Sequence, residues 1–135
     1  MLSSSHNRAY QDFLTLLTNF RNFVDGWNNS DRQSKVSSEF EGLERWFQEN
    51  IVQIDSSDIE LSIVAHWQSV QTEIKREFKL LATDILFFAS ARQNATQKKR
   101  QKSIKDRITK LIGYCQILLK EEIQIDLNNE GEAKV

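Results

Sequence analysis

The side chains best suited to catalysis or metal binding are few and widely separated in this sequence. The histidines are His6 and His66, and His66 has no carboxylate or histidine three or four residues further along, where a helix would place a second metal ligand. Cys115, the single cysteine, lies in a run of apolar residues, whereas a nucleophilic thiol needs an electropositive, exposed setting. No glycine-rich phosphate loop or serine elbow is present. We therefore predict a protein that is not an enzyme and that uses no metal or cofactor.

A short basic segment is the clearest functional feature. Residues 92–110 carry eight basic side chains and one acidic side chain, a charge of +7 in a chain whose net charge is −1. On a helix, Lys98, Lys102 and Lys105 fall within about 60° of one another, with Lys99 on the flank. Such a stripe is either an ordinary solvated face or an electrostatic contact for an acidic partner or for phosphates. The candidate partner-binding residues are Arg92, Lys98, Lys99, Lys102 and Lys105.

Nucleic-acid binding is the competing interpretation of the same segment. That function favours aromatic side chains interleaved with the basic ones, and residues 92–110 contain none. The whole chain is also slightly acidic, with 19 acidic and 18 basic side chains, which is not typical of a DNA-binding domain. A nucleic-acid-associated regulator that uses the basic helix 92–110 is therefore kept as the alternative function.

A second feature is the apolar segment 80–89. Leu81 and Ile85 continue the helical stripe of the predicted core, but three other large residues point away from that stripe. These residues are Leu80, Leu86 and Phe87. Either another helix of the chain covers them, or they contact a second copy or an apolar part of a partner. We predict the contact, and with it a possible homodimer.

The elements that must position these residues are predicted to be helices. The 135 residues include no proline and only four glycines, the residues that all-β folds use at their turns. Apolar residues recur at steps of three and four along almost the whole chain, as in amphipathic helices. The predicted helices span residues of about 5–25, 34–53, 58–94 and 97–122, and residues 123–135 are expected to form a frayed tail.

These helices predict a single all-α domain over residues 1–135, an antiparallel four-helix bundle. The third helix would be roughly 55 Å long and the first two roughly 30 Å each. This mismatch predicts a long hairpin of the third and fourth helices that projects beyond the two shorter helices. The basic segment would lie on the projecting part.

The sequence also bears on the compartment. A lone cysteine excludes a disulfide within the chain and fits a reducing cytoplasm. The opening residues, MLSSSHNRAY, have neither the basic region nor the apolar region of a signal peptide. No stretch reaches the ~18 apolar residues of a membrane span. We predict a cytoplasmic protein that does not insert into membranes.

Three stretches of the chain are similar to segments of one known family. They are Tyr10-Gln11-Asp12-Phe13 with Leu16-Leu17, then WQSVQTEIKREFKLLATDILFFASARQNATQKKR from Trp67 to Arg100, and DRITKLIGYCQILL from Asp106 to Leu119. Together they resemble the heterocyst frequency control protein PatD family of cyanobacteria. The combination of WQSVQTEI, DILFF and ARQ carries most of the resemblance, and residues 20–60 are not part of it.

The resemblance implies a small non-enzymatic regulator. PatD-like proteins are associated with setting the proportion of cells that differentiate into nitrogen-fixing heterocysts. They are also associated with binding the tubulin-like division protein FtsZ and altering how its filaments assemble. FtsZ is an acidic polymer, so the +7 segment would be a docking surface for it, and a dimer would present two such surfaces. The family offers no catalytic residues to carry over.

Overall fold

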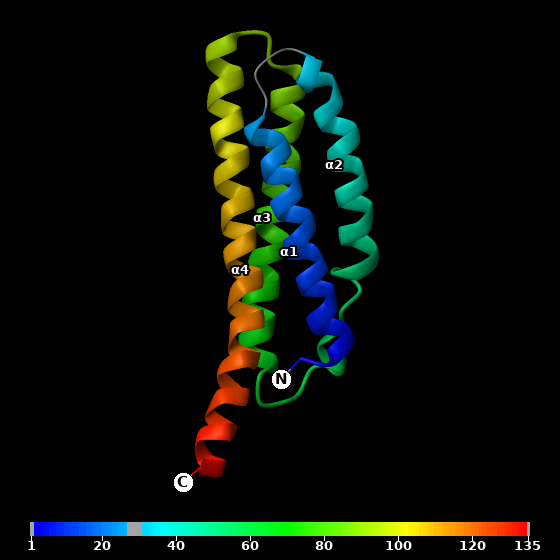
Figure 1. The fold of residues 1–135 in the computed structure, drawn as a ribbon. Helices are drawn as coiled ribbons and strands as arrows, with labels where there is room; N and C mark the ends of the chain where they lie inside the picture. Colours follow the sequence, from blue (N-terminus) through cyan, green and yellow to red (C-terminus); the bar gives the residue numbers. More distant parts are fainter. Residues whose placement is uncertain (1, 27–30, 135) are drawn as a thin grey trace.

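Four long α-helices joined by short connections make up the fold. The computed structural model describes the backbone of residues 2–26 and 31–134 and the side chains of residues 2–26 and 35–119. The elements are α1 (Ser4–Asp25), α2 (Asp31–Asn50), the short 3-10 helix η1 (Ser56–Asp58), α3 (Val64–Ser90) and α4 (Asn94–Lys134). Successive helices run in opposite directions (Figure 1). The predicted all-α antiparallel bundle is confirmed.

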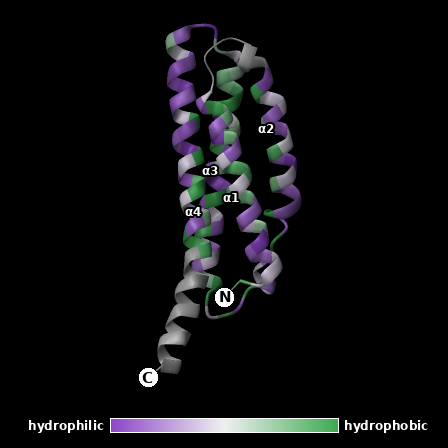
Figure 2. Cartoon of the chain, viewed as in Figure 1, coloured by the Kyte–Doolittle hydropathy of each residue, from purple (hydrophilic) through white to green (hydrophobic). Residues whose placement is uncertain are grey.

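The helices form a ring around one core. α4 packs against α1 and α3, and α2 packs against the same two helices from the other side. Figure 1 shows α2 and α4 on opposite sides of the bundle. Hydrophilic residues predominate along the first half of α4 in Figure 2, while the apolar residues Ile104, Ile108 and Leu111 of that helix are fully buried. The basic and apolar stripes of α4 therefore separate as its 3.6-residue period predicts.

The centre of the core is a cluster of aromatic rings contributed by three helices. The rings of Phe47 from α2 and Phe78 from α3 are stacked, with centroids 3.9 Å apart. Phe13 of α1 lies 5.2 Å from Phe47, and Phe40 lies 5.3 Å from Phe78. All four side chains are buried. This cluster joins α2 to α1 and α3.

α3 begins later than the sequence predicts. At the expected start, about residue 58, the side chain of Asp55 accepts a hydrogen bond from the Ser57 amide at 3.0 Å. This bond starts the short helix η1 rather than α3. Ile59 follows in an extended conformation and is buried, being only 7% exposed. Burying Ile59 holds the chain out of a helix until Val64.

The turn between α3 and α4 also lies earlier than predicted. The Ser90 hydroxyl donates to the carbonyl oxygens of Leu86 and Phe87, and Ala91 is extended, so α3 ends before residue 94. The side-chain amide of Gln97 closes the turn by donating to the Ala91 carbonyl oxygen at 3.0 Å. Asn94, expected as the last residue of the third helix, is the first residue of α4.

The α3–α4 hairpin consequently projects less than the sequence predicts. The Gln101 side chain donates to the Val24 carbonyl oxygen at 2.9 Å, so α1 ends alongside residue 101. The stretch of α4 before this point is about two helical turns long. The beginning of α2 lies close to the level of the hairpin turn (Figure 1). At the other end α4 continues as a helix to Lys134, where a frayed tail was expected from residue 123. Val135 lies outside the described residues.

Candidate protein-interaction surface

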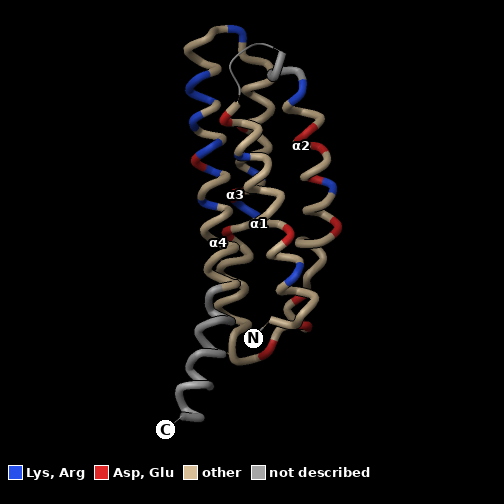
Figure 3. The backbone as a smooth tube through the Cα atoms, viewed as in Figure 1, with Lys and Arg blue, Asp and Glu red and all other residues tan. Residues whose placement is uncertain are grey.

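The apolar stripe of α4 determines which of its side chains face solvent. α4 contacts α1 and α3, and its stripe is fully buried against them. The stripe residues with no exposed surface are Ile104, Ile108, Leu111 and Cys115. Because a helix has 3.6 residues per turn, the positions opposite this stripe must point away from the bundle. Figure 3 shows the lysines and arginines gathered along this first half of α4.

Four of the five candidate partner-binding residues are exposed. Lys98, Lys99 and Lys102 lie in the first turns of α4, and Arg92 lies in the connection that precedes it. Within the part of the chain that the structure describes, none of these four side chains forms an ion pair. We call Arg92, Lys98, Lys99 and Lys102 the basic surface. It is the part of the basic segment whose charge is left uncompensated.

Lys105, the fifth candidate, belongs to a contact within the chain. Its ammonium nitrogen lies 2.8 Å from a carboxylate oxygen of Asp25 at the end of α1. Both side chains are more than 40% exposed, and pairs of this kind contribute only about 0–1 kcal/mol to stability. Lys105 therefore lies at the edge of the basic surface, and Asp25 of α1 partly compensates its charge.

The remaining cations of the segment turn inward toward two carboxylates of α3. Arg100 lies 3.4 Å from Asp84, and Arg107 contacts both Asp84 and Glu77. Lys110 lies 3.9 Å from Glu77. The side chains of Glu77 and Asp84 are only 3% and 6% exposed. Half of the eight cations counted in the sequence are thus engaged within the chain.

Arg107 is the centre of this buried charge cluster. Burial opposes its charged form, but the hydrogen bonds and charges of Asp84 and Glu77 outweigh that effect and raise the pKa of Arg107 above its ordinary value. Asp84 also accepts a hydrogen bond from the Ser103 hydroxyl at 2.8 Å. The cluster ties α3 to α4 and so fixes the rotation of α4 that turns the basic surface outward. The sequence offered one signal of this cluster that we did not use, namely two acidic residues seven positions apart beside an apolar stripe.

The three apolar candidates differ in their exposure to solvent. Leu80 is half-buried, whereas Leu86 and Phe87 are 68% and 47% exposed. As consecutive residues of a helix, Leu86 and Phe87 point in directions about 100° apart. Phe87 lies beside α4, with the guanidinium carbon of Arg100 4.7 Å from its ring centroid. Self-association through these residues stays a prediction.

The side chains first considered for chemistry lie in different surroundings in the structure. Cys115 is buried, and burial raises the pKa of its thiol to about 12, so the thiol stays protonated at neutral pH. His66 is exposed near the start of α3. Among the described residues no three histidine, cysteine or acidic side chains are arranged to hold a metal ion. Over the same residues, no helix combines the length and apolar character that a membrane crossing requires.

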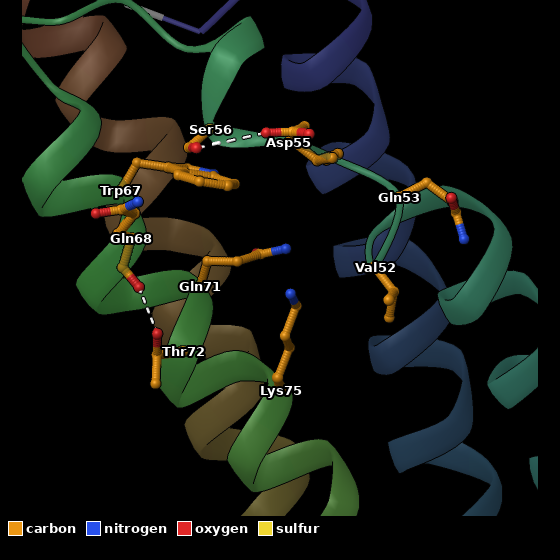
Figure 4. Close-up of a pocket in the computed structure, with 10 residues that line it drawn as sticks. Val52, Gln53, Asp55, Ser56, Trp67, Gln68, Gln71, Thr72 and Lys75 are labelled. Atoms are coloured by element: carbon orange, nitrogen blue, oxygen red, sulfur yellow. Dashed lines mark hydrogen bonds between the residues drawn. The ribbon is translucent and has the colours of Figure 1, made fainter.

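A separate concave region lies between α3 and the connection after α2. It encloses about 600 Å³, and Trp67, Gln71 and Lys75 of α3 line one side of it (Figure 4). Behind it, the Trp67 indole N–H donates to the Tyr10 hydroxyl at 2.9 Å, and that hydroxyl donates to the Gln71 side-chain oxygen at 2.7 Å. The Gln71 amide nitrogen donates to the Ile51 carbonyl oxygen at 3.0 Å. These buried groups satisfy one another, so we assign them a structural role.

Tyr10→Phe is expected to lower the free energy of unfolding by about 1–3 kcal/mol, because it leaves the Trp67 N–H and a Gln71 oxygen buried without a partner. Urea denaturation followed by circular dichroism measures this loss. Tyr114→Phe is the matched control, since Tyr114 is only half-buried, and its effect should stay within about 0.5 kcal/mol. Equal stability of the two variants would contradict the role assigned to the Tyr10 hydroxyl.

Comparisons of the chain with family models, curated proteins and solved structures find no match. Function is therefore inferred from the basic surface and from the resemblance of residues 67–100 and 106–119 noted above. Of these two grounds, only the basic surface is a structural observation.

Proposed function

We propose that this protein is a non-enzymatic regulator that binds FtsZ filaments through the basic surface and alters their assembly. In this proposal it acts in the cytoplasm and influences the proportion of cells that differentiate, as its resemblance to the PatD family implies. The observation that carries the proposal is that Arg92, Lys98, Lys99 and Lys102 are exposed together and that, among the described residues, no acid pairs with them.

The arrangement of these charges favours a binding role over an ordinary solvated face. Lys98 and Lys102 are four residues apart on α4, and two like charges at that spacing destabilise a helix by about 0.2–0.5 kcal/mol. Arg100 and Arg107, in the same helix, have acidic partners on α3. An uncompensated positive surface attracts an acidic polymer over a distance of roughly 10 Å at moderate salt.

Reversing three of the four charges of the basic surface should weaken the interaction. We expect wild-type protein to sediment with FtsZ polymers formed with GTP, and the variant Lys98→Glu, Lys99→Glu, Lys102→Glu to bind roughly tenfold more weakly or worse, because each reversal replaces attraction by repulsion. Raising the salt concentration should weaken wild-type binding steeply. Wild-type protein that stays in the supernatant at every salt concentration would refute the proposal.

A second charge-reversed variant serves as the matched control. Arg8→Glu, Lys35→Glu and Arg45→Glu change three exposed cations of α1 and α2, and the resulting protein has the same net charge as the test variant. If binding depends on the basic surface, the control should keep most of its affinity. Equal losses in the two variants would show that net charge, rather than this surface, drives sedimentation.

The nucleic-acid alternative gains one observation from the structure. The sequence offers no aromatic residue between positions 92 and 110, but the fold brings Phe87 of α3 beside Arg100 of α4. An exposed ring next to cations is a feature of single-strand binding sites. Binding to random duplex and single-stranded DNA at physiological salt discriminates the two functions. If the FtsZ proposal is right, neither form of DNA should bind as tightly as FtsZ does.

A further inference from the structure

Phe87 and Arg100 form a composite element at the seam between α3 and α4. The Phe87 side chain is 47% exposed although it is large and apolar. The guanidinium carbon of Arg100 lies 4.7 Å from the centroid of its ring, which is within the range of a cation–π contact. The ring is thus partly covered by a cation and partly open to solvent.

Arg100 is held in this position from its inner side as well. One of its guanidinium nitrogens donates to Asp84 at 3.4 Å, and Asp84 is itself fixed by Ser103 and Arg107. The Arg100 side chain nevertheless remains 38% exposed. A guanidinium has five N–H donors, and those not used by Asp84 can receive a carboxylate from outside. Because the group is already ordered, little side-chain entropy is lost when it binds.

The surroundings of the pair are cationic. Lys99 precedes Arg100 in the chain, is exposed, and forms no ion pair with any described residue. Arg92, in the connection between the two helices, is also exposed. An apolar ring bordered by uncompensated positive charge is complementary to an acidic segment that carries an apolar side chain. Binding energy at interfaces concentrates on aromatic and arginine residues of this kind.

We infer that the Phe87–Arg100 pair is the anchor point for an acidic segment of the protein partner, in which a carboxylate meets Arg100 and a large apolar side chain packs on Phe87. This inference rests on the proposed function, since it names the chemistry of the partner of the basic surface. It differs from a purely electrostatic contact in one respect. The partner must present an apolar residue together with its acidic ones.

Two synthetic peptides test this inference without FtsZ. One contains only glutamate and glycine, and the other is identical except that one glycine is replaced by leucine. We expect the leucine peptide to bind wild-type protein about tenfold more tightly in NMR titrations at low salt, because burial of its side chain against the ring adds to the charge attraction. In Phe87→Ala this preference should disappear.

Leu61→Ala is the matched control, because Leu61 is another exposed apolar residue, at 92% exposure, and lies before α3, outside the basic surface and the predicted apolar contact. It should keep the full preference for the leucine peptide. For the guanidinium, Arg100→Lys should weaken both peptides several-fold, whereas Arg76→Lys, which changes an exposed arginine paired with Glu73, should weaken neither.

Three results would overturn the inference. The first is that the two peptides bind the wild type equally, and the second is that Phe87→Ala keeps the preference. The third is that a single-stranded oligonucleotide of equal charge binds more tightly than either peptide and loses its affinity in Phe87→Ala. The peptide preference and FtsZ sedimentation are separate measurements, so failure of one is distinguishable from failure of the other.

Discussion

Asp84→Ala is expected to lower the free energy of unfolding by about 3–5 kcal/mol, the range found when one partner of a buried ion pair is removed. Asp84 is 4% exposed and accepts hydrogen bonds from Ser103, Arg100 and Arg107. Without it, the partly buried guanidinium of Arg107 keeps Glu77 as its one acidic contact among the described residues. The expected loss of stability comes from leaving the partly buried charge of Arg107 with too little negative charge around it, rather than from removing one favourable attraction.

Equilibrium denaturation in urea measures this effect. The matched control is Glu73→Ala, which removes an acid from the same helix whose partner, Arg76, is 62% exposed. That pair is solvated, so its loss should change the stability by less than about 1 kcal/mol. A similarly small change in Asp84→Ala would show that solvent screens the charge of Arg107, whose side chain is 26% exposed, and the charge cluster would not hold α3 to α4 as we describe.

Replacing the three buried charges together separates the two contributions. In Glu77→Leu, Asp84→Leu, Arg107→Met, none of these charges remains, and replacement of buried ion pairs or triads by apolar residues in other proteins is neutral or stabilising by about 1–4 kcal/mol. Arg100 would lose its inner contact in this variant. We therefore expect a stable bundle in which the Phe87–Arg100 pair is less ordered.

The hydrophobic pattern was sufficient to predict the bundle but not its internal charge contacts. The α4 stripe of Ile104, Ile108 and Leu111 is fully buried, as its period requires. The same helical spacing placed Lys105 on one face with the other lysines. The pattern of a single helix does not reveal which neighbouring helix that face will contact. Only the position of α1 shows that Lys105 meets Asp25.

The helix ends were predicted less well for a related reason. Asp55 and Ser57 were both capable of capping a helix, and local sequence gives no energy difference that decides between them. The burial of Ile59, a tertiary contact, settles the choice in favour of η1. The candidate surface was likewise found through its lysines, whereas the contact of Phe87 with Arg100 depends on how α3 and α4 are aligned.

Phe78→Ala is expected to cost about 3–5 kcal/mol, the usual range for deleting a core phenylalanine. Phe78 is 3% exposed and lies against Phe13, Phe40 and Phe47, so its ring joins three helices. A groove of about 690 Å³ between α2 and α3 is lined in part by Phe47 and Phe78. Water can enter the space left by the ring from this side, which places the expected loss toward the lower end of the range.

Phe87→Ala is the control in the same helix, and it should cost less than about 1 kcal/mol because its ring is already half in solvent. Alanine has the higher helix propensity by about 0.5 kcal/mol, so both substitutions strengthen α3 as an isolated helix. Any destabilisation in Phe78→Ala must therefore come from packing between helices. A loss below about 1 kcal/mol would mean that the aromatic cluster does not hold α2 in place, and the bundle would depend mainly on the contacts of α4 with α1 and α3.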